Sequence, residues 1–318
     1  MDDRILLKTE NLVKDYDGRT AVNGLNLEVR SGEMVGLVGP DGAGKTTTIR
    51  MLCGALSPTS GRIQVAGYDV PDQVELARED TGYLAQNFSL YGDLTVAENL
   101  HFFGAVFDLP NDEIERRQKR LLEFAGLTAF ADRPAHALSG GMQKKLGLAT
   151  ALIHDPKVLL LDEPTGGVDP VARQEFWHLL IGLLRSGSAV LVSTPYMDEA
   201  MRFSRVIFMN EGRALLEGRP RQLIQRLSGR ILELDASSQA AARPVALADP
   251  DVEDVQSFGE QLHLRVSDPS GPLARLPKAL ESAGVKLNDL KPVEPTLEDV
   301  FIHLLETTSH GDQPPDGD

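Results

Sequence analysis

The chain has 318 residues, of which 42% are apolar and 25% charged, a composition typical of a folded globular protein. Its formal net charge is −15, and residues 231–318 carry 17 acidic against 6 basic side chains, so the negative charge is concentrated there. No basic face is visible, which disfavours a nucleic-acid-binding protein, and no apolar run reaches the ~20 residues that cross a bilayer. The first residues, Met1-Asp-Asp-Arg, do not begin a signal peptide, and the single cysteine, Cys53, permits no internal disulfide.

Strands dominate the first part of the chain. Residues 6–13 and 25–29 alternate apolar and polar side chains, as half-exposed strands do, and Asp17-Gly18 between them is a typical turn. Residues 34–38 are continuously apolar, which indicates a buried strand. The other elements expected here are a helix at 46–56, closed by Ser57-Pro58, and a strand at 62–66.

A helical segment follows, from about residue 87 to residue 137. Thr95 and Glu98 match a capping box at the start of one helix, and residues 112–124 predict a charged amphipathic helix. Beyond this segment strands and helices alternate, which is typical of an α/β protein with a mainly parallel sheet. The expected elements are helices from about 139, at 171–184 and from 197, and strands at 158–161, 189–192 and 205–209.

A second, smaller unit is expected from residue 231. Its candidate strands are at 231–235 and 261–266, and its candidate helices are at 273–283 and 296–306. The last residues are polar and rich in proline and glycine, so we expect them to be disordered. The predicted organisation is a first domain at 1–230, a small α+β domain at 231–306 and a disordered tail at 307–318.

The clearest motif lies between the strand at 34–38 and the helix that follows it. Gly39-Pro-Asp-Gly-Ala-Gly-Lys45-Thr46 fits the pattern G-x-x-x-x-G-K-[ST] of a phosphate-binding loop. Its glycines let the backbone wrap a phosphate chain, and the N–H groups at the helix start face the negative charge. Lys45 can reach the β- and γ-phosphates of a nucleotide, and the Thr46 hydroxyl can bind Mg²⁺.

A second motif, Val158-Leu-Leu-Leu-Asp162-Glu163, ends a buried strand with two acids. Ligands of parallel sheets bind at the carboxyl ends of the strands, where Asp162 would lie. Its carboxylate can hold Mg²⁺ through water, and Glu163 is placed to orient or deprotonate an attacking water. Alone this could be an ordinary strand end, but together with the phosphate-binding loop it indicates nucleotide hydrolysis.

A third motif, Leu138-Ser-Gly-Gly-Met142, opens a helix with Ser139 as the expected N-cap. Gly140 and Gly141 expose backbone N–H groups at the positive end of that helix, which makes a second anion site. Because the phosphate-binding loop already holds the phosphates, this second site must serve something else. The three motifs, in this order, resemble the ATPase subunit of an ABC transporter. In that family the signature helix contacts the γ-phosphate held by the other subunit of a dimer.

The resemblance covers about residues 5–225 and assigns roles to further positions. Tyr16 matches the aromatic residue that stacks on adenine, and Asp169 matches the loop that links the two sites. Gln86 matches the glutamine that senses Mg²⁺ and water and couples to the membrane partner. The implied catalytic residues are Glu163 and Gln86. The implied Mg²⁺ ligands are Thr46, Gln86 and Asp162. The implied ATP-binding residues are Tyr16, Gly39, Pro40, Asp41, Gly42, Ala43, Gly44, Lys45, Thr46, Thr47, Ser139, Gly140, Gly141 and Asp169.

The resemblance also implies a fold and partners. The fold is the P-loop ABC ATPase fold: a RecA-like parallel-sheet core, an antiparallel β subdomain and a helical signature subdomain, about 87–137, that grips the transmembrane subunit. Residues 276–305, especially Glu294-Pro-Thr-Leu-Glu-Asp-Val-Phe301, resemble the C-terminal extension of daunorubicin-resistance-type exporter ATPases, which belong to the ABC-2 type. The implied partners are permease subunits and a second ATP-binding subunit, identical or different. The expected location is the cytoplasm, on the inner face of the plasma membrane.

Two residues depart from the family pattern. Asp41 stands where asparagine is usual and adds negative charge near the phosphates. Pro195, in Ser193-Thr194-Pro195, replaces the histidine that polarises the γ-phosphate and the attacking water. Proline can end the strand but cannot supply that chemistry. We therefore expect Ser193, Thr194 or a backbone group to substitute for the histidine in part.

Three interpretations follow. The first is an ATPase that drives an exporter through separate membrane subunits. The second is a soluble ABC protein acting on ribosomes or DNA. Members that resemble translation factors carry two complete sets of the three motifs, whereas this chain carries one set, and its acidic C-terminal part disfavours binding to nucleic acid. The third, motivated by Pro195, is an ATP-dependent switch that hydrolyses ATP slowly or not at all.

Overall fold

The computed structural model describes residues 4–87, 89–185 and 187–309. The chain divides into two compact units, Met1–Gly218 and Arg219–Asp318. The division falls earlier than the expected boundary after residue 230, because helix α8 (Pro220–Gln225) packs on helix α11 (Leu297–Ser309) of the second unit. Within the described ranges, no helix is both long enough and apolar enough to span a bilayer.

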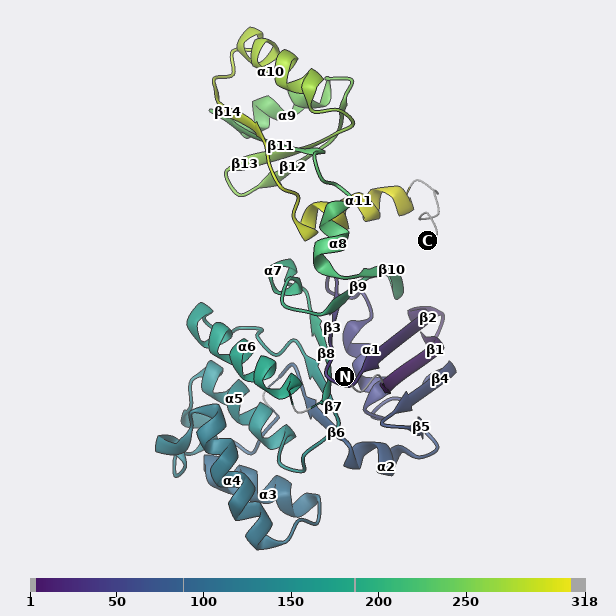
Figure 1. The fold of residues 1–318 in the computed structure, drawn as a ribbon, viewed down its shortest axis with the longest axis vertical. Helices are drawn as coiled ribbons and strands as arrows, with labels where there is room; N and C mark the ends of the chain where they lie inside the picture. The colour runs from purple at the N-terminus through teal and green to yellow at the C-terminus, as the bar shows by residue number, and fades with distance from the viewer. Residues whose placement is uncertain (1–3, 88, 186, 310–318) are drawn as a thin grey trace. The chain divides into compact units, whose positions relative to one another are not determined.

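The larger sheet of the first unit has six strands in the order β10-β9-β3-β8-β7-β6 (Figure 1). Its neighbouring strands are parallel except for the β9–β10 hairpin, so the predicted mainly parallel core is confirmed. β10 was not predicted. The strands are β3 (Met34–Val38), β6 (Thr81–Leu84), β7 (Val158–Asp162), β8 (Ala189–Thr194), β9 (Arg205–Asn210) and β10 (Arg213–Gly218).

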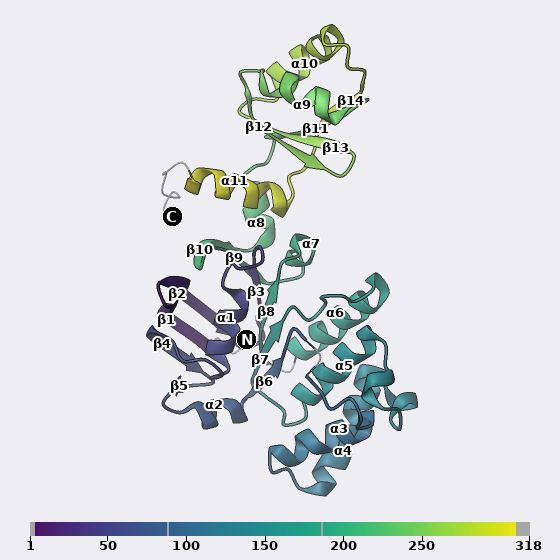
Figure 2. The ribbon, with the colours of Figure 1, turned by 180° about the vertical axis from the view of Figure 1, so that it is seen from behind.

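The smaller sheet is antiparallel, in the order β2-β1-β4-β5, and lies beside the parallel one in both views (Figures 1 and 2). Its first hairpin turns at Asp17-Gly18 as predicted, with φ angles of 49° and 89° at these two residues. The strands are longer than the alternation in sequence indicated, because they pair almost to the turn. They are β1 (Ile5–Tyr16), β2 (Arg19–Arg30), β4 (Ser60–Val65) and β5 (Tyr68–Val70).

The helices of the first unit begin where the sequence predicted caps. The Thr95 capping box is present at the start of α3, and Ser139 caps α5. α1 ends at Leu52 rather than at residue 56, because Gly54 adopts a left-handed φ of 69°. The helices are α1 (Lys45–Leu52), α2 (Val74–Glu79), α3 (Val96–Val106), α4 (Asn111–Ala125), α5 (Gly140–Ala151), α6 (Pro170–Leu184) and α7 (Met197–Ala200), with 3₁₀ turns η1 (Thr128–Phe130) and η2 (Ala135–Ala137).

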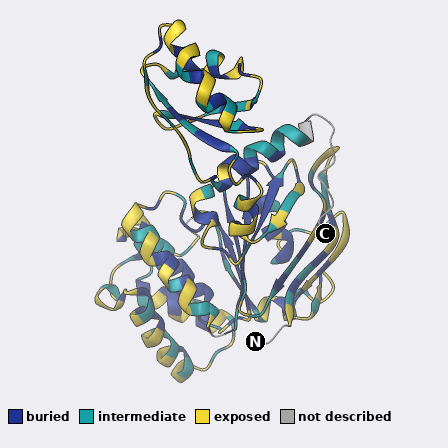
Figure 3. Ribbon diagram, turned by 45° about the horizontal axis from the view of Figure 1, so that its top comes forward, coloured by how far each residue is buried: buried dark blue, intermediate teal, exposed yellow. Residues whose placement is uncertain are grey.

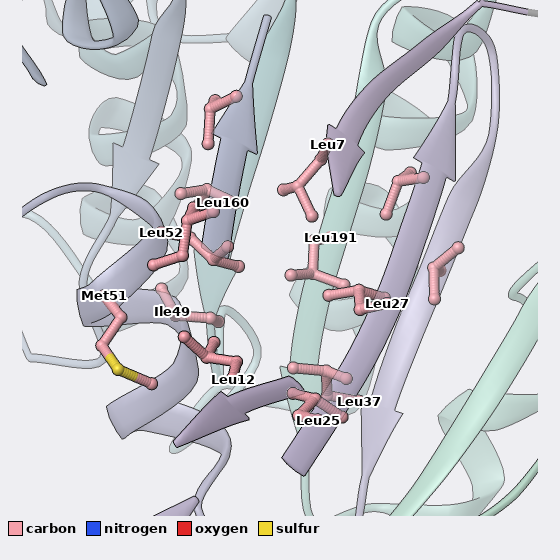
Figure 4. Packing of buried hydrophobic residues seen from close by; sticks show 14 of the residues in the cluster. Leu7, Leu12, Leu25, Leu27, Leu37, Ile49, Met51, Leu52, Leu160 and Leu191 are labelled. Atoms are coloured by element: carbon pink, nitrogen blue, oxygen red, sulfur yellow. The ribbon is translucent and has the colours of Figure 1, made fainter. Parts of the chain in front are cut away.

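The main core of the first unit lies between the two sheets. β3, β7 and β8 are buried along their whole length, whereas the antiparallel strands are buried on one face (Figure 3). Figure 4 shows leucines of both sheets and the apolar face of α1 meeting in this core. The core therefore fixes α1, and the loop in front of it, against the ends of β3 and β7.

The second unit is a β-α-β-β-α-β arrangement with one antiparallel sheet, in the order β12-β13-β11-β14. The predicted strands β11 and β13 are present, but β12, β14 and α9 were missed. Helix α11 extends to Ser309, so residues 307–309 are helical and not disordered; the rest of the predicted tail lies outside the described residues. The elements are α8, β11 (Ile231–Ala236), α9 (Gln239–Leu247), β12 (Val252–Phe258), β13 (Gln261–Val266), α10 (Ser270–Ser282), β14 (Leu287–Pro292) and α11.

Candidate functional site

The phosphate-binding loop connects β3 to α1, and two of its glycines have no room for a side chain. A Cβ on Gly39 would lie 2.1 Å from the carbonyl oxygen of Met209, and one on Gly44 would lie 2.4 Å from that of Ala21. Gly44 also has a φ of 100°, which favours glycine. As the N-cap of α1 it has no side chain to cap the first N–H groups, so these remain available to an anion.

Lys45 is the first residue of α1 and is only 4% exposed. Its Nζ donates hydrogen bonds to the carbonyl oxygens of Gly39, at 2.7 Å, and Pro40, at 2.9 Å. Burial lowers the pKa of the Lys45 ammonium, while three nearby carboxylates, that of Glu163 foremost, act to raise it. This buried cation can exchange its carbonyl partners for phosphate oxygens.

Asp162, at the end of β7, is 1% exposed and faces the start of α1. Its Oδ1 accepts hydrogen bonds from Thr46 Oγ1, at 3.0 Å, and Ser193 Oγ, at 2.6 Å. Its Oδ2 is buried without any hydrogen-bond partner. An orphaned carboxylate oxygen beside a threonine hydroxyl fits Mg²⁺, which binds oxygen ligands. Among the described residues no group of three or more His, Cys, Asp or Glu side chains could hold a metal, so phosphate and water oxygens would complete the coordination.

Glu163 and Gln86, the two implied catalytic residues, are in contact. Gln86 Nε2 donates a hydrogen bond to Glu163 Oε2 at 2.8 Å. The Glu163 backbone has a left-handed φ of 45°, and its N–H donates to both the carbonyl oxygen and the hydroxyl oxygen of Ser193. The Gln86 carbonyl accepts a hydrogen bond from Lys144 on α5. Gln86 therefore holds the carboxylate of Glu163, and Ser193 holds its backbone.

A cavity of about 520 Å³, called the nucleotide cavity below, is lined by Glu163, Lys45 and Thr46 and also by Tyr16. Its volume lies within the range of ligand pockets. Lys14 Nζ lies 5.1 Å from the centroid of the Tyr16 ring, and Tyr16 lines the cavity whereas Lys14 does not. The cavity is lined by Tyr16, Arg19, Thr20, Ala21, Asp41, Gly42, Gly44, Lys45, Thr46, Thr47, Glu163 and Glu211.

Comparisons with known proteins show the family of this chain. A family model described as "ABC transporter" matches residues 22–166, and one described as "ATP-binding protein DrrA1-3-like, C-terminal domain" matches residues 218–305. The chain is 40% identical over 301 residues to the "Nod factor export ATP-binding protein I" of Ralstonia nicotianae, and the alignment covers 94% of this chain and 93% of that protein. The chain belongs to the ABC transporter ATP-binding proteins.

Other similar proteins extend the comparison. The "Probable multidrug ABC transporter ATP-binding protein YbhF" of Escherichia coli is 37% identical over 318 residues, which are 99% of this chain and 54% of that protein. Among solved structures, cbiO1 from Clostridium perfringens, "Part of the ABC transporter complex cbiONQ", has a TM-score of 0.65 and 31% identity, covering 78% of this chain and 96% of that one. The ATP-binding cassette MJ0796, in a dimer bound to ADP and Pi, has a TM-score of 0.62 and 28% identity, covering 67% of this chain and 98% of that one. The predicted ABC ATPase fold is thus confirmed.

The first residues of the signature helix α5 of this ABC protein pack within their own part of the chain. Ser139 Oγ accepts a hydrogen bond from the N–H of Met142, and a Cβ on Gly141 would lie 2.6 Å from the Cβ of Ala172 on α6. Neither the serine nor the glycines line the nucleotide cavity. Gly140 instead lines a second cavity, of about 220 Å³, together with Gln86.

Asp169 also lies apart from the nucleotide cavity. Its Oδ1 accepts hydrogen bonds from the N–H groups of Val171, at 3.1 Å, and Ala172, at 3.0 Å, so it is the N-cap of α6. The single chain therefore brings the phosphate-binding loop, Tyr16 and Glu163 to one cavity, and hydrogen bonds attach Asp162 and Gln86 to Thr46 and Glu163. Ser139, Gly140, Gly141 and Asp169 do not line that cavity.

The two hydroxyl residues before Pro195 both donate hydrogen bonds to buried carboxylates. Ser193 Oγ donates to Asp162, and Thr194 Oγ1 donates to Glu199 Oε2 at 2.7 Å, and both side chains are fully buried. The expectation that Ser193, Thr194 or a backbone group substitutes in part for the histidine stays a prediction.

Glu199 is a residue of this region that the sequence analysis missed. It is 1% exposed, and its Oε1 accepts a hydrogen bond from Thr165 Oγ1 at 2.6 Å, in addition to the bond from Thr194. Arg173 Nε lies 3.8 Å from the same carboxylate. The pair Asp198-Glu199 predicts only an acidic first turn of α7. Only the tertiary packing distinguishes the two acids, because it buries Glu199 and leaves the Asp198 side chain 73% exposed.

Proposed function

We propose that this protein binds and hydrolyses ATP and thereby drives an ABC exporter through separate transmembrane permease subunits. The observation that carries the proposal is a pair of hydrogen bonds at the nucleotide cavity. Thr46 and Glu163 line the cavity together with Lys45, Thr46 donates to Asp162, and Glu163 accepts from Gln86. The family membership and the exporter names of its relatives support the coupling to transport.

In the proposed reaction the adenine stacks on Tyr16, and the N–H groups of the loop and Lys45 bind the phosphates. Thr46 and Asp162 would hold Mg²⁺, with Gln86 nearby, and the ion would neutralise charge on the phosphate oxygens. Glu163 accepts a proton from the attacking water, and the Gln86 amide keeps its carboxylate in place. Most of this catalysis is positioning and electrostatics, so it can proceed, more slowly, without a histidine at position 195.

The proposal includes a dimer of ATP-binding subunits, identical or different. The nucleotide cavity of this chain is not lined by Ser139, Gly140 or Gly141, and the N-terminus of α5 offers N–H groups to an anion. They would contact the γ-phosphate held by the second subunit, with Asp169 in the loop between the two sites. The protein would act in the cytoplasm, at the inner face of the plasma membrane, held there by its permease partners.

Phosphate release by the purified chain, alone and with its membrane partners, tests this function. We expect slow ATP hydrolysis that Lys45→Ala and Glu163→Gln abolish. Hydrolysis that Glu163→Gln leaves unchanged would show that another site is responsible. If the wild type binds ATP without hydrolysing it in either preparation, the ATP-dependent switch, motivated by Pro195, replaces the ATPase. Purification with ribosomes or DNA, and not with an integral membrane protein, would favour the soluble alternative.

A further inference from the structure

The nucleotide cavity is lined by a second cation that belongs to none of the sequence motifs. Arg19 is exposed and lines the cavity together with Tyr16 and Lys45. Within the residues that the structure describes, its guanidinium has no hydrogen-bond or ion-pair partner. An unpartnered arginine at the wall of an anion-binding cavity is available to the ligand.

The β1–β2 hairpin fixes the place of Arg19. Tyr16 and Arg19 are paired directly across the two-residue turn at Asp17-Gly18, where both φ angles are positive, as tight hairpins require. The Asp15 carboxylate accepts a hydrogen bond from the N–H of Gly18 at 2.9 Å, which ties down the tip. The arginine is thus held beside the ring that is expected to stack on the base.

The same strand leads from Arg19 to the phosphate-binding loop. The carbonyl of Ala21 packs against Gly44, and two residues of a strand advance by roughly 6.6 Å. The Arg19 backbone is therefore level with Tyr16, and it lies roughly 6.6 Å along the strand from the point where Ala21 meets the loop. Lys45 lies deeper, bonded to the carbonyls of Gly39 and Pro40, where the terminal phosphates would bind.

The acidic side chains in the cavity lining would repel a polyphosphate, and a second cation would reduce that repulsion. The lining contains three acidic residues, Asp41, Glu163 and Glu211, in addition to Lys45. Asp41 and Glu211 are exposed at the loop and at the β9–β10 turn. A guanidinium among them offsets their repulsion of a polyphosphate, and it can form paired, charge-assisted hydrogen bonds to phosphate oxygens.

We propose that Arg19 binds the α-phosphate of the bound nucleotide, the group that ATP and ADP share. The proposal rests on the nucleotide-binding function proposed above. It separates affinity from chemistry: Arg19 sets how tightly either nucleotide binds, and the residues around Lys45 and Glu163 act on the γ-phosphate.

The test is titration calorimetry of the full chain with MgATP and with MgADP. Arg19→Ala should weaken the binding of both nucleotides by the same factor, roughly 10- to 100-fold, and Arg19→Lys by less. Arg62→Ala is the matched control, because Arg62 is an exposed arginine on β4 of the same sheet and does not line the cavity.

Equal affinity of Arg19→Ala and the wild type for both nucleotides would overturn the proposal. A loss of affinity for ATP but not for ADP would also overturn it, because it would place Arg19 at the γ-phosphate. A lower hydrolysis rate of Arg19→Ala at saturating ATP, with unchanged affinity, would overturn it as well. Absence of ATP binding by the wild type would refute the proposed function itself. Binding by the wild type that Lys45→Ala abolishes and Arg19→Ala leaves intact would refute only the role of Arg19.

Discussion

Replacing Glu199 by alanine is expected to destabilise the first unit strongly, although the residue is not expected to touch the nucleotide. The side chain is 1% exposed, and its two oxygens accept hydrogen bonds from Thr165 and Thr194, which are themselves 1% and 0% exposed. Arg173 Nε, 3.8 Å away, has no hydrogen-bond partner, and Arg173 Nη1 lies 3.7 Å from the exposed carboxylate of Asp198. Alanine would leave two buried hydroxyls and one partly buried cation without the carboxylate.

The magnitude follows from these contacts. Each buried polar group left unsatisfied costs about 1–3 kcal/mol, and removing one partner of a buried ion pair costs about 3–5 kcal/mol. These effects overlap at one site, so we expect about 3–5 kcal/mol for Glu199→Ala. Glu199→Gln keeps a carbonyl oxygen for one threonine and an amide for the other, and loses only the charge, so about 1–2 kcal/mol is expected.

Urea unfolding, monitored by tryptophan fluorescence, measures this change in the free energy of unfolding. Trp177 is the single tryptophan of the chain, is fully buried and lies in α6, so its signal reports the first unit. The midpoint should fall by roughly 1–2 M for Glu199→Ala. Asp198→Ala is the matched control: the neighbouring acid is 73% exposed and should change stability by less than about 0.5 kcal/mol. A shift for Glu199→Ala as small as that of Asp198→Ala would refute the argument.

Four further predictions concern chemistry, assembly and pH. Lys45→Ala should abolish ATP binding or hydrolysis, since it removes the buried cation of the loop; turnover like that of the wild type in a phosphate-release assay would contradict this. Glu163→Gln with MgATP should trap a dimer in gel filtration, and adding Ser139→Arg should prevent it; a dimer that tolerates the arginine would show that the signature does not face the second nucleotide. Pro195→His should raise the hydrolysis rate, by up to roughly 10²–10³, if the missing polarising group limits the reaction, and a flat or lower rate would show that it does not. Burial lowers the pKa of His154 from 6.5 to about 4, so the protonated form favours unfolding: its contribution to stability is complete above pH 6.5 and is lost as the pH falls to about 4. His154→Gln should therefore lessen the loss of stability between pH 7 and 4 by about 2–3 kcal/mol, and an unchanged pH dependence of urea unfolding would argue against it.

Some elements could not be recognised from local sequence. β14 carries asparagine, aspartate and lysine, ends with Pro292 and is an edge strand, so it lacks the alternation of a half-buried one. α9 contains Pro244 within the helix, which argues against a helix on local grounds. Both exist because neighbouring strands and the core of the second unit stabilise them, and tertiary packing overrides propensity.

The sequence by itself determined the phosphate-binding loop, the acidic strand end at Asp162-Glu163 and the capped signature helix. In each case contiguous residues form the motif, and their spacing carries the chemistry. Only the tertiary structure decided how groups distant in sequence meet: Thr46 donates to Asp162 across 116 positions, and Gln86 to Glu163 across 77. It also buries Glu199 while exposing Asp198, and it turns Arg19 toward the nucleotide cavity. Burial and long-range contacts depend on which elements pack together, and no local pattern of side chains encodes that.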